Sequence, residues 1–226
     1  EIITVYASAG ISGLGNEDIT INDARLTASS FNSISAYTTG EIDITAALIF
    51  QGSSEDLLKA FKVNTDRSIT GFGNKAVILS DTTLSASSLN SINESTTGII
   101  NAATANIFVG SEADLLKAYK ASVDGSIKGL GNEAVILNYT MTYKSWANGL
   151  KTLSASFLNS INEFTTLGLN TTQGNIITGS LADLLKAYKA NESGSISGLE
   201  NKEIILTESL TVSQFNDLAA KTSGVI

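Results

Sequence analysis

Three regularly spaced aspartates are the first residues here with the chemistry to bind a ligand. Asp56, Asp114 and Asp183 are separated by 58 and then 69 residues, and each follows a serine by three positions. A ladder of carboxylates suits a hard cation such as calcium. The same Ser-x-x-Asp spacing is that of a helix N-cap. We interpret the residues as structural caps without a metal site, with calcium as an alternative: Ser53 with Asp56, Ser111 with Asp114, and Ser180 with Asp183.

The composition argues against enzyme chemistry. The chain holds no histidine and no cysteine, so the usual general base, the commonest metal ligand and all thiolate sites are missing. The motif at residues 71–74, Gly-Phe-Gly-Asn, and its copies lack the lysine of a phosphate-binding loop, and we interpret them as turns. The doubled threonines, such as Thr96-Thr97, resemble the hydroxyl row of an ice-binding surface, but the glycine that follows favours turn chemistry. We predict no catalytic residues and no enzyme activity.

Internal repeats organise the elements that would position these residues. Each Ser-x-x-Asp segment opens an amphipathic stretch, in which Leu115, Leu116 and Tyr119 form one apolar stripe. The Gly-x-Gly-Asn turn recurs with the same offsets of 58 and 69 residues. Two markers with one period indicate a solenoid. We predict one solenoid domain over residues 1–226, with repeats 1–68, 69–126 and 127–195 and a partial repeat 196–226.

Each repeat is predicted to hold strands and two kinds of helix. The segment 77–79, Val-Ile-Leu, and its copies are mostly continuously apolar, which is typical of parallel strands covered on both faces. The second helix has Ser85 as its N-cap and Leu84 and Leu89 at the hydrophobic-staple positions. Gly98 is predicted to end this helix in the left-handed conformation. Its counterparts are Gly40, Gly168 and Gly224.

The predicted fold class is therefore α/β, a repeat solenoid with a parallel β-sheet core and short helices. Strand-helix coils of roughly 29 residues pair into the 58-residue period. Stacked strands lie about 4.8 Å apart and packed helices about 8–10 Å apart. If the two helix types lay on different sides of the stack, each side would meet a helix about every 9.6 Å. We hypothesise this arrangement as the reason for the doubled period. A horseshoe with every helix on one side is the alternative.

Charge and hydropathy limit the partners. The net charge is −8, and lysine and arginine form no cluster, so we expect no nucleic acid partner. No apolar run reaches transmembrane length, so we expect no membrane insertion. The sequence begins and ends within the repeat pattern. We therefore expect a segment of a longer array, or open solenoid ends that stack head to tail on further copies of the chain.

One insertion interrupts the repeats. In the third repeat 16 positions separate Leu137 from Leu153, where 5 separate Leu79 from Leu84. Insertions in solenoids form loops, often on the binding face, and Trp and Tyr dominate interface hot spots. We expect aromatic residues of the insertion 138–152 to bind a surface glycan or a neighbouring subunit, or to cover their own coil. These candidate interface residues are Tyr139, Tyr143 and Trp146.

Several phrases carry a family resemblance: Gly-Leu-Gly-Asn-Glu-Ala-Val-Ile-Leu at 129–137, Leu-Ser-Ala-Ser-Ser-Leu-Asn-Ser-Ile at 84–92, and Gly-Ser-Glu-Ala-Asp at 110–114. They resemble the Ser/Thr/Asn-rich tandem repeats of very large secreted or cell-surface proteins of marine cyanobacteria. The resemblance implies an extracellular structural or adhesive array and brings no catalytic residues with it. We predict a scaffold segment or fibre subunit that stacks end to end. The alternative is a glycan-binding adhesin module that uses the aromatic insertion.

Overall fold

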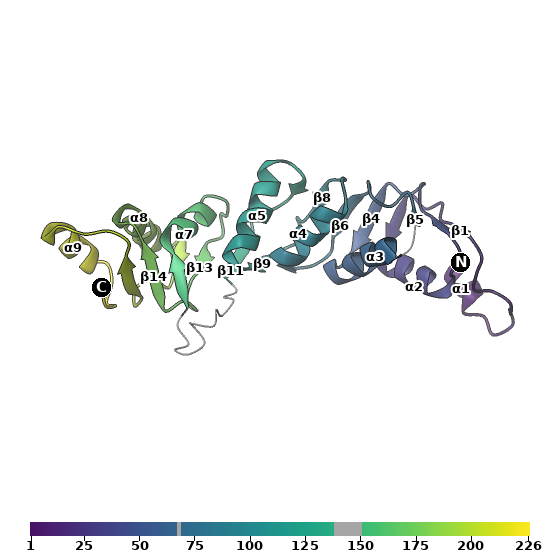
Figure 1. Ribbon diagram of the computed structural model, residues 1–226, viewed down its shortest axis with the longest axis horizontal. Helices are drawn as coiled ribbons and strands as arrows, with labels where there is room; N and C mark the ends of the chain where they lie inside the picture. The colour runs from purple at the N-terminus through teal and green to yellow at the C-terminus, as the bar shows by residue number, and fades with distance from the viewer. Residues whose placement is uncertain (67–68, 138–150) are drawn as a thin grey trace. The chain divides into compact units, whose positions relative to one another are not determined.

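The computed structural model of the protein describes residues 1–66, 69–137 and 151–226. Two compact units divide the chain: unit 1 is Glu1–Ala105 with Lys120–Leu130, and unit 2 is Asn106–Tyr119 with Gly131–Ile226. In both units short parallel strands alternate with helices along the chain (Figure 1). The predicted α/β solenoid of strand-helix coils is confirmed. One continuous domain over the whole chain stays a prediction.

Unit 1 contains two all-parallel sheets, ordered β1-β3-β5 and β10-β8-β6-β4-β2. Its strands are β1 (Ile19–Thr20), β2 (Arg25–Thr27), β3 (Ile42–Asp43), β4 (Ile49–Gly52), β5 (Ile69–Thr70), β6 (Ala76–Leu79), β7 (Thr83–Ser85), β8 (Ile100–Asn101) and β10 (Ile127–Lys128). Its helices are α1 (Ile2–Tyr6), α2 (Ala28–Tyr37), α3 (Ser54–Asp66) and α4 (Ala86–Ser95).

Unit 2 repeats this plan. Strands β9, β11, β13 and β15 form one parallel row, and β12, β14 and β16 form a second. The strands are β9 (Ile107–Gly110), β11 (Ala134–Leu137), β12 (Thr152–Ser154), β13 (Leu169–Asn170), β14 (Ile176–Gly179), β15 (Ile196–Ser197) and β16 (Glu203–Leu206). The helices are α7 (Ala155–Asn162), α8 (Leu181–Glu192) and α9 (Val212–Ala219), and α5 (Glu112–Val123) begins in this unit.

In each unit one longer strand pairs with a strand on both of its edges. Val77 of β6 is in register with Phe50 of β4 on one side and with Ile100 of β8 on the other. Strand β11 pairs in the same way with β9 and β13. After β11 the chain enters the second row of unit 2 at β12. In unit 2 the second row of strands therefore begins later in the chain than the first.

The core lies between the strands and one layer of helices. Strands β6 and β11 alternate between buried and half-buried residues: Val77 and Leu79 are buried, while Ile78 between them is half-exposed. The prediction that these strands are covered on both faces is therefore wrong. In unit 1 the buried face carries an aromatic cluster in which Phe72 contacts Phe31 and Phe50 at ring distances of 5.2 Å.

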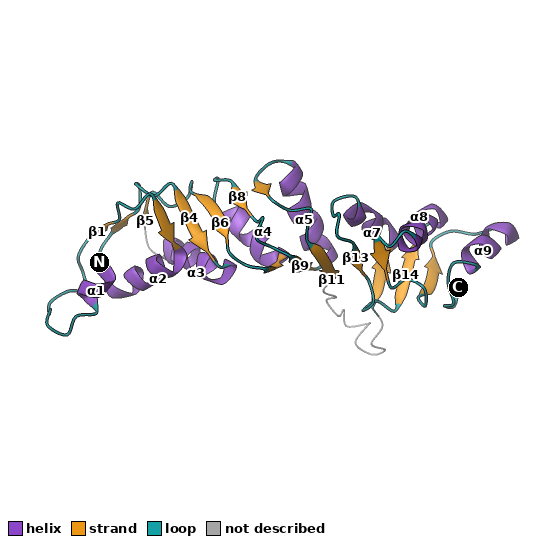
Figure 2. Cartoon of the chain, turned by 180° about the vertical axis from the view of Figure 1, so that it is seen from behind, coloured by secondary structure: helices purple, strands orange, loops and turns teal. Residues whose placement is uncertain are grey.

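Consecutive helices pack directly on each other. Helix α3 contacts both α2 and α4, and α7 contacts α8. In unit 1 these helices lie in a row along one side of the strands (Figure 2). The hypothesis that the two helix types occupy different sides of the stack is therefore wrong within the units. Helices α2, α3 and α4 begin at residues 28, 54 and 86, so the two half-repeats are 26 and 32 residues long rather than equal.

The second helix of the repeat begins as predicted and ends differently. The Ser85 hydroxyl accepts a hydrogen bond from Ser88 N–H at 3.4 Å, and the staple residues Leu84 and Leu89 are fully buried. Gly98, like Gly40 and Gly224, has no positive φ, so the predicted left-handed cap is wrong for these three glycines. A Cβ at Gly98 would collide with the carbonyl of Lys75, so close approach between coils requires the glycine. Gly168, at φ +90°, differs from them.

Candidate functional site

The predicted Ser-x-x-Asp pairs lie at the starts of α3, α5 and α8. The Ser53 hydroxyl accepts a hydrogen bond from Asp56 N–H at 3.1 Å and donates one to the Asp56 carboxylate at 3.0 Å. Both contacts recur between Ser111 and Asp114, at 3.2 and 2.6 Å, and between Ser180 and Asp183, at 3.2 and 2.7 Å. These are the contacts of a helix N-cap. Each carboxylate is held by its own serine.

An acid from the next coil strengthens two of these caps. Asp81 accepts hydrogen bonds from Ser54 N–H at 2.7 Å and from the Ser54 hydroxyl at 3.0 Å. In unit 2, Glu208 accepts one from Leu181 N–H at 2.6 Å at the equivalent place. Negative charge is stabilising at a helix N-terminus. The acid therefore couples the start of each helix to the following coil.

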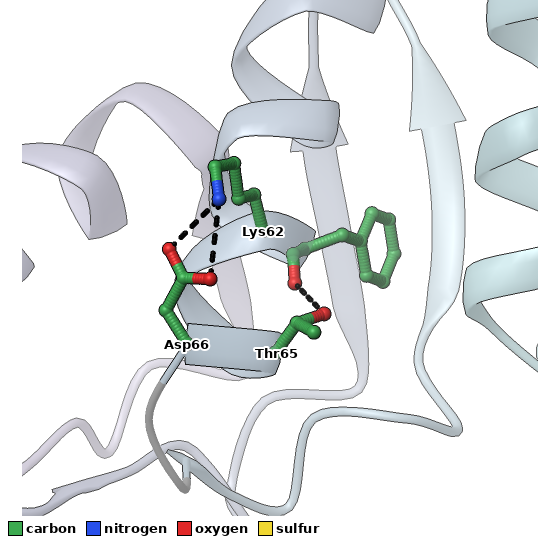
Figure 3. A network of polar contacts seen from close by, with 4 residues as sticks. Lys62, Thr65 and Asp66 are labelled. Carbon is green, nitrogen blue, oxygen red and sulfur yellow. Dashed lines mark hydrogen bonds and ion pairs between the residues drawn. The ribbon is translucent and has the colours of Figure 1, made fainter.

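Contacts at the other end of α3 are local, and the ion pair among them is solvent-exposed (Figure 3). Lys62 donates to both carboxylate oxygens of Asp66, at 3.1 and 3.0 Å, and the Thr65 hydroxyl donates to the Phe61 carbonyl at 3.2 Å. The side chains of Lys62 and Asp66 are 74% and 59% exposed. A surface pair of this kind contributes about 0.3–0.5 kcal/mol. It serves as a control for the caps rather than as a candidate site.

The doubled threonines join neighbouring coils. The Thr96 hydroxyl donates to the Lys75 carbonyl at 3.0 Å and accepts from Gly98 N–H at 3.0 Å. Thr97 N–H donates to the Gly73 carbonyl at 2.9 Å. The pattern recurs from Thr38 to Glu17, at 2.6 Å, and from Thr165 to Glu133, at 2.8 Å. The bond from Gly98 N–H to Thr96 is the contact of a turn, as the sequence interpretation expects, and the bonds to the Glu17, Lys75 and Glu133 carbonyls add a bridge between coils that it did not include.

One ionisable position per repeat lies at the base of the Gly-x-Gly-Asn turn and changes its charge from repeat to repeat. The residues are Glu17, Lys75, Glu133 and Lys202. Where it is Glu133, the carboxylate accepts hydrogen bonds from Gly131 N–H at 2.7 Å and Asn132 N–H at 3.0 Å. Where it is Lys75, the ammonium donates to the Thr45 carbonyl of the preceding coil at 3.0 Å. One position therefore anchors the turn in two different ways.

Glu133 is fully buried, and unit 2 supplies a hydrogen-bond donor for it from α5. The Tyr119 hydroxyl donates to the Glu133 carboxylate, and the Tyr119 ring stacks on Phe164 with 5.2 Å between centroids. Burial, followed by the hydrogen bond to this carboxylate, raises the pKa of the Tyr119 phenol. In unit 1, Tyr6 donates to Glu17 at 3.0 Å. These contacts satisfy the buried carboxyl group of Glu133 with hydrogen bonds from the protein itself.

The aromatic candidates Tyr139, Tyr143 and Trp146 lie outside the described residues. Within residues 1–66, 69–137 and 151–226, no group of three or more acidic side chains is placed to hold a metal ion. In the same ranges, no helix has both the length and the apolar character needed to cross a bilayer.

An exposed apolar surface belongs to the coil of β16 and α9, and we call it the α9 face. It is a groove of about 390 Å³ lined by Leu206, Glu208, Leu210, Thr211, Val212 and Phe215. Val212 is 79% exposed and Phe215 is 44% exposed. Their counterparts in α7, Ala155 and Leu158, are fully buried under β14 and α8. This surface can bind an apolar partner.

Sequence reasoning missed the alternating anchor position and the α9 face. Both leave a signal in the aligned repeats. The alternation of Glu and Lys after the turn is visible in the sequence, as is Val212 at a position that is alanine in Ala28, Ala86 and Ala155.

Comparison with known proteins adds no identification: no family model, no curated protein and no solved structure matches the chain. The resemblance of its repeats to those of large cyanobacterial surface proteins therefore stays a prediction.

Proposed function

We propose that this chain is an extracellular or cell-surface structural protein, a scaffold segment that associates end to end with further copies of itself. Neighbouring coils bury one another throughout each unit, through paired strands, packed helices and the threonine bridges. In solenoids much of the stability comes from such contacts between neighbouring repeats. The residues that join the coils are used for cohesion, which favours a mechanical role over chemistry.

The exposed α9 face is the observation that carries the proposal. Phe215 is exposed on this face, whereas Phe31 and Leu89, which hold the same position in inner coils, are fully buried. An exposed, contiguous apolar surface on a soluble protein marks an interaction site. A surface of the same repeat type supplies matching strand edges and apolar side chains, so a second copy is the partner it suits best.

Sedimentation velocity over a concentration series tests the proposal, together with electron microscopy of the purified chain. We expect self-association that Phe215→Asp weakens by at least roughly tenfold, since a buried charge would face an apolar partner. Leu48→Asp is the matched control, because Leu48 is a 70% exposed apolar residue of unit 1 and is not among the residues that line this face. A protein that stays monomeric at every concentration would refute the proposal. Glycan binding that Trp146→Ala abolishes, with sedimentation unchanged, would favour an adhesin instead.

A further inference from the structure

Helices α2 and α3 of unit 1 pack on each other and leave a groove of about 460 Å³ between them. Asn32 of α2 lines this groove and ties the two helices together, because its Nδ2 donates to the Asp56 carbonyl of α3 at 2.9 Å. Helices α7 and α8 of unit 2 are tied in the same way, from Asn159 Nδ2 to the Asp183 carbonyl at 3.0 Å. The two helix pairs can therefore be compared position by position.

The two helix pairs differ in one acidic residue. In unit 2 the Glu163 carboxylate of α7 accepts from the Lys186 ammonium of α8 at 2.7 Å, so an ion pair spans the helices. In unit 1, Ala36 holds the position of Glu163, and Lys59 holds the position of Lys186. Lys59 makes no hydrogen bond or ion pair with the residues that the structure describes. Because Ala36 and Lys59 both line the groove, it is open where unit 2 carries a carboxylate.

The other lining residues suit a ligand that carries hydroxyl groups. Ser29 and Ser33 of α2 line the groove and are exposed, and a serine hydroxyl both donates and accepts hydrogen bonds. Tyr37 adds an aromatic wall: it is 38% exposed, and its ring stacks on Tyr6 with 5.5 Å between centroids. A sugar ring combines hydroxyl groups with an apolar C–H face, and the groove offers a partner to each.

An acidic peptide matches the groove less well than a sugar does. The lining residues lie on helices, so most of their backbone groups are paired within α2 and α3. Peptides are recognised through backbone pairing at a sheet edge or through apolar anchors in a hydrophobic groove. Here the free partners are side chains, mainly hydroxyl groups and one ammonium group.

We propose that the groove between α2 and α3 binds a saccharide that carries a carboxylate, such as a uronic acid residue. Its carboxylate pairs with the Lys59 ammonium, in the role that Glu163 has in unit 2. Its hydroxyl groups bond to Ser29 and Ser33, and a C–H face lies against Tyr37. The volume of the groove is within the range of small-ligand sites. The inference is independent of end-to-end association, because all the residues that line the groove belong to unit 1.

An NMR titration with trigalacturonate tests the proposal, and the fully methyl-esterified trisaccharide is the matched neutral ligand. We expect trigalacturonate to bind in the millimolar range and to shift the amide signals of Ser29, Ser33 and Lys59. The methyl ester, or Lys59→Gln, should weaken binding roughly twofold to fivefold, as expected for the loss of one exposed ion pair. Lys62→Gln is the control and should change nothing, since Lys62 already pairs with Asp66. Silent amides, equal affinity for the methyl ester, or tighter binding of triglutamate would overturn the proposal.

Exchanging the acidic position between the units tests the role of the missing carboxylate. Ala36→Glu gives Lys59 a partner within the protein, so trigalacturonate should no longer bind. Glu163→Ala removes the ion pair of unit 2, so the Ser156 and Ser160 amides should then shift as well. Both substituted positions are exposed, and circular dichroism checks that each variant folds. Binding retained by Ala36→Glu, or silent Ser156 and Ser160 amides in Glu163→Ala, would overturn the inference.

Discussion

Replacing Gly131 by alanine tests whether the charge of the anchor position sets the backbone of the turn. Gly131 has φ +118°, and its N–H donates to the Glu133 carboxylate at 2.7 Å. A glutamate at this position requires the amide two residues earlier to point back toward its side chain. Gly15, which has φ +141°, donates to Glu17 in the same way, also at 2.7 Å.

The lysine repeats impose no such requirement. Gly73 precedes Lys75 and has no positive φ, and Glu200 takes the same position before Lys202. A lysine side chain has no acceptor for the turn amide, so the peptide can adopt an ordinary conformation. The glycine is therefore needed in the glutamate repeats and dispensable in the lysine repeats.

The magnitude follows from the two environments. An L-residue at positive φ costs about 1–2 kcal/mol, and a Cβ at Gly131 would lie 3.2 Å from the Phe164 carbonyl oxygen. We expect Gly131→Ala to lower the free energy of unfolding by about 1–2 kcal/mol. At Gly73 a Cβ would meet no atom within 4 Å. There alanine should be neutral or stabilising by up to about 1 kcal/mol, because it restricts the unfolded chain.

Urea unfolding followed by circular dichroism measures both variants, with the difference in free energy taken from the midpoint and slope. Equal costs at the two glycines would refute the reasoning, since a general preference for glycine in the turn would then explain both. A neutral Gly131→Ala would also refute it, because the carboxylate would not be holding the backbone.

Three further predictions use the same measurement. Thr96→Val should cost about 1–3 kcal/mol by leaving buried backbone groups without their partner, whereas the exposed Thr97→Val should stay within about 0.5 kcal/mol; equal effects would contradict the bridging role. Asp81→Ala should cost about 1 kcal/mol by removing the acid from the start of α3, against about 0.3–0.5 kcal/mol for Asp66→Ala. Because the folded-state pKa of Tyr119 is raised, its contribution is complete below the unfolded pKa of about 10 and is lost above it. The free energy of unfolding should therefore fall more steeply above about pH 10 in the wild type than in Tyr119→Phe, and identical slopes would contradict this.

The repeat pattern and the helix starts could be predicted because they depend on local chemistry. A serine three residues before an aspartate satisfies the first amides of a helix whatever surrounds it. The staple leucines likewise act within one turn of their own helix. Both signals recur at the repeat period, which is why the α/β solenoid was accessible from the sequence.

The features that were predicted wrongly depend on neighbouring coils. The same apolar stripe buries a helix equally well on either side of a stack, so the sequence did not decide between one helix layer and two. Ile78 is apolar but half-exposed, which made a one-sided strand resemble a fully covered one. Gly98 is required by a carbonyl of the preceding coil rather than by its own φ. A glycine in a sequence does not reveal which of these two needs it meets.

Because the helices of each unit form a single layer, the spacing of the helices does not match the spacing of the strands beneath them. Two helices packed side by side need about 16–20 Å, whereas three hydrogen-bonded strands such as β2, β4 and β6 span about 9.6 Å. A single uninterrupted row of strands under these helices would accumulate this difference in every repeat. In unit 2 the chain instead leaves the row of β11 and starts a second row at β12. The row that begins at β12 takes its own strand positions under α7 and α8, so the difference does not accumulate from β11 onward in unit 2.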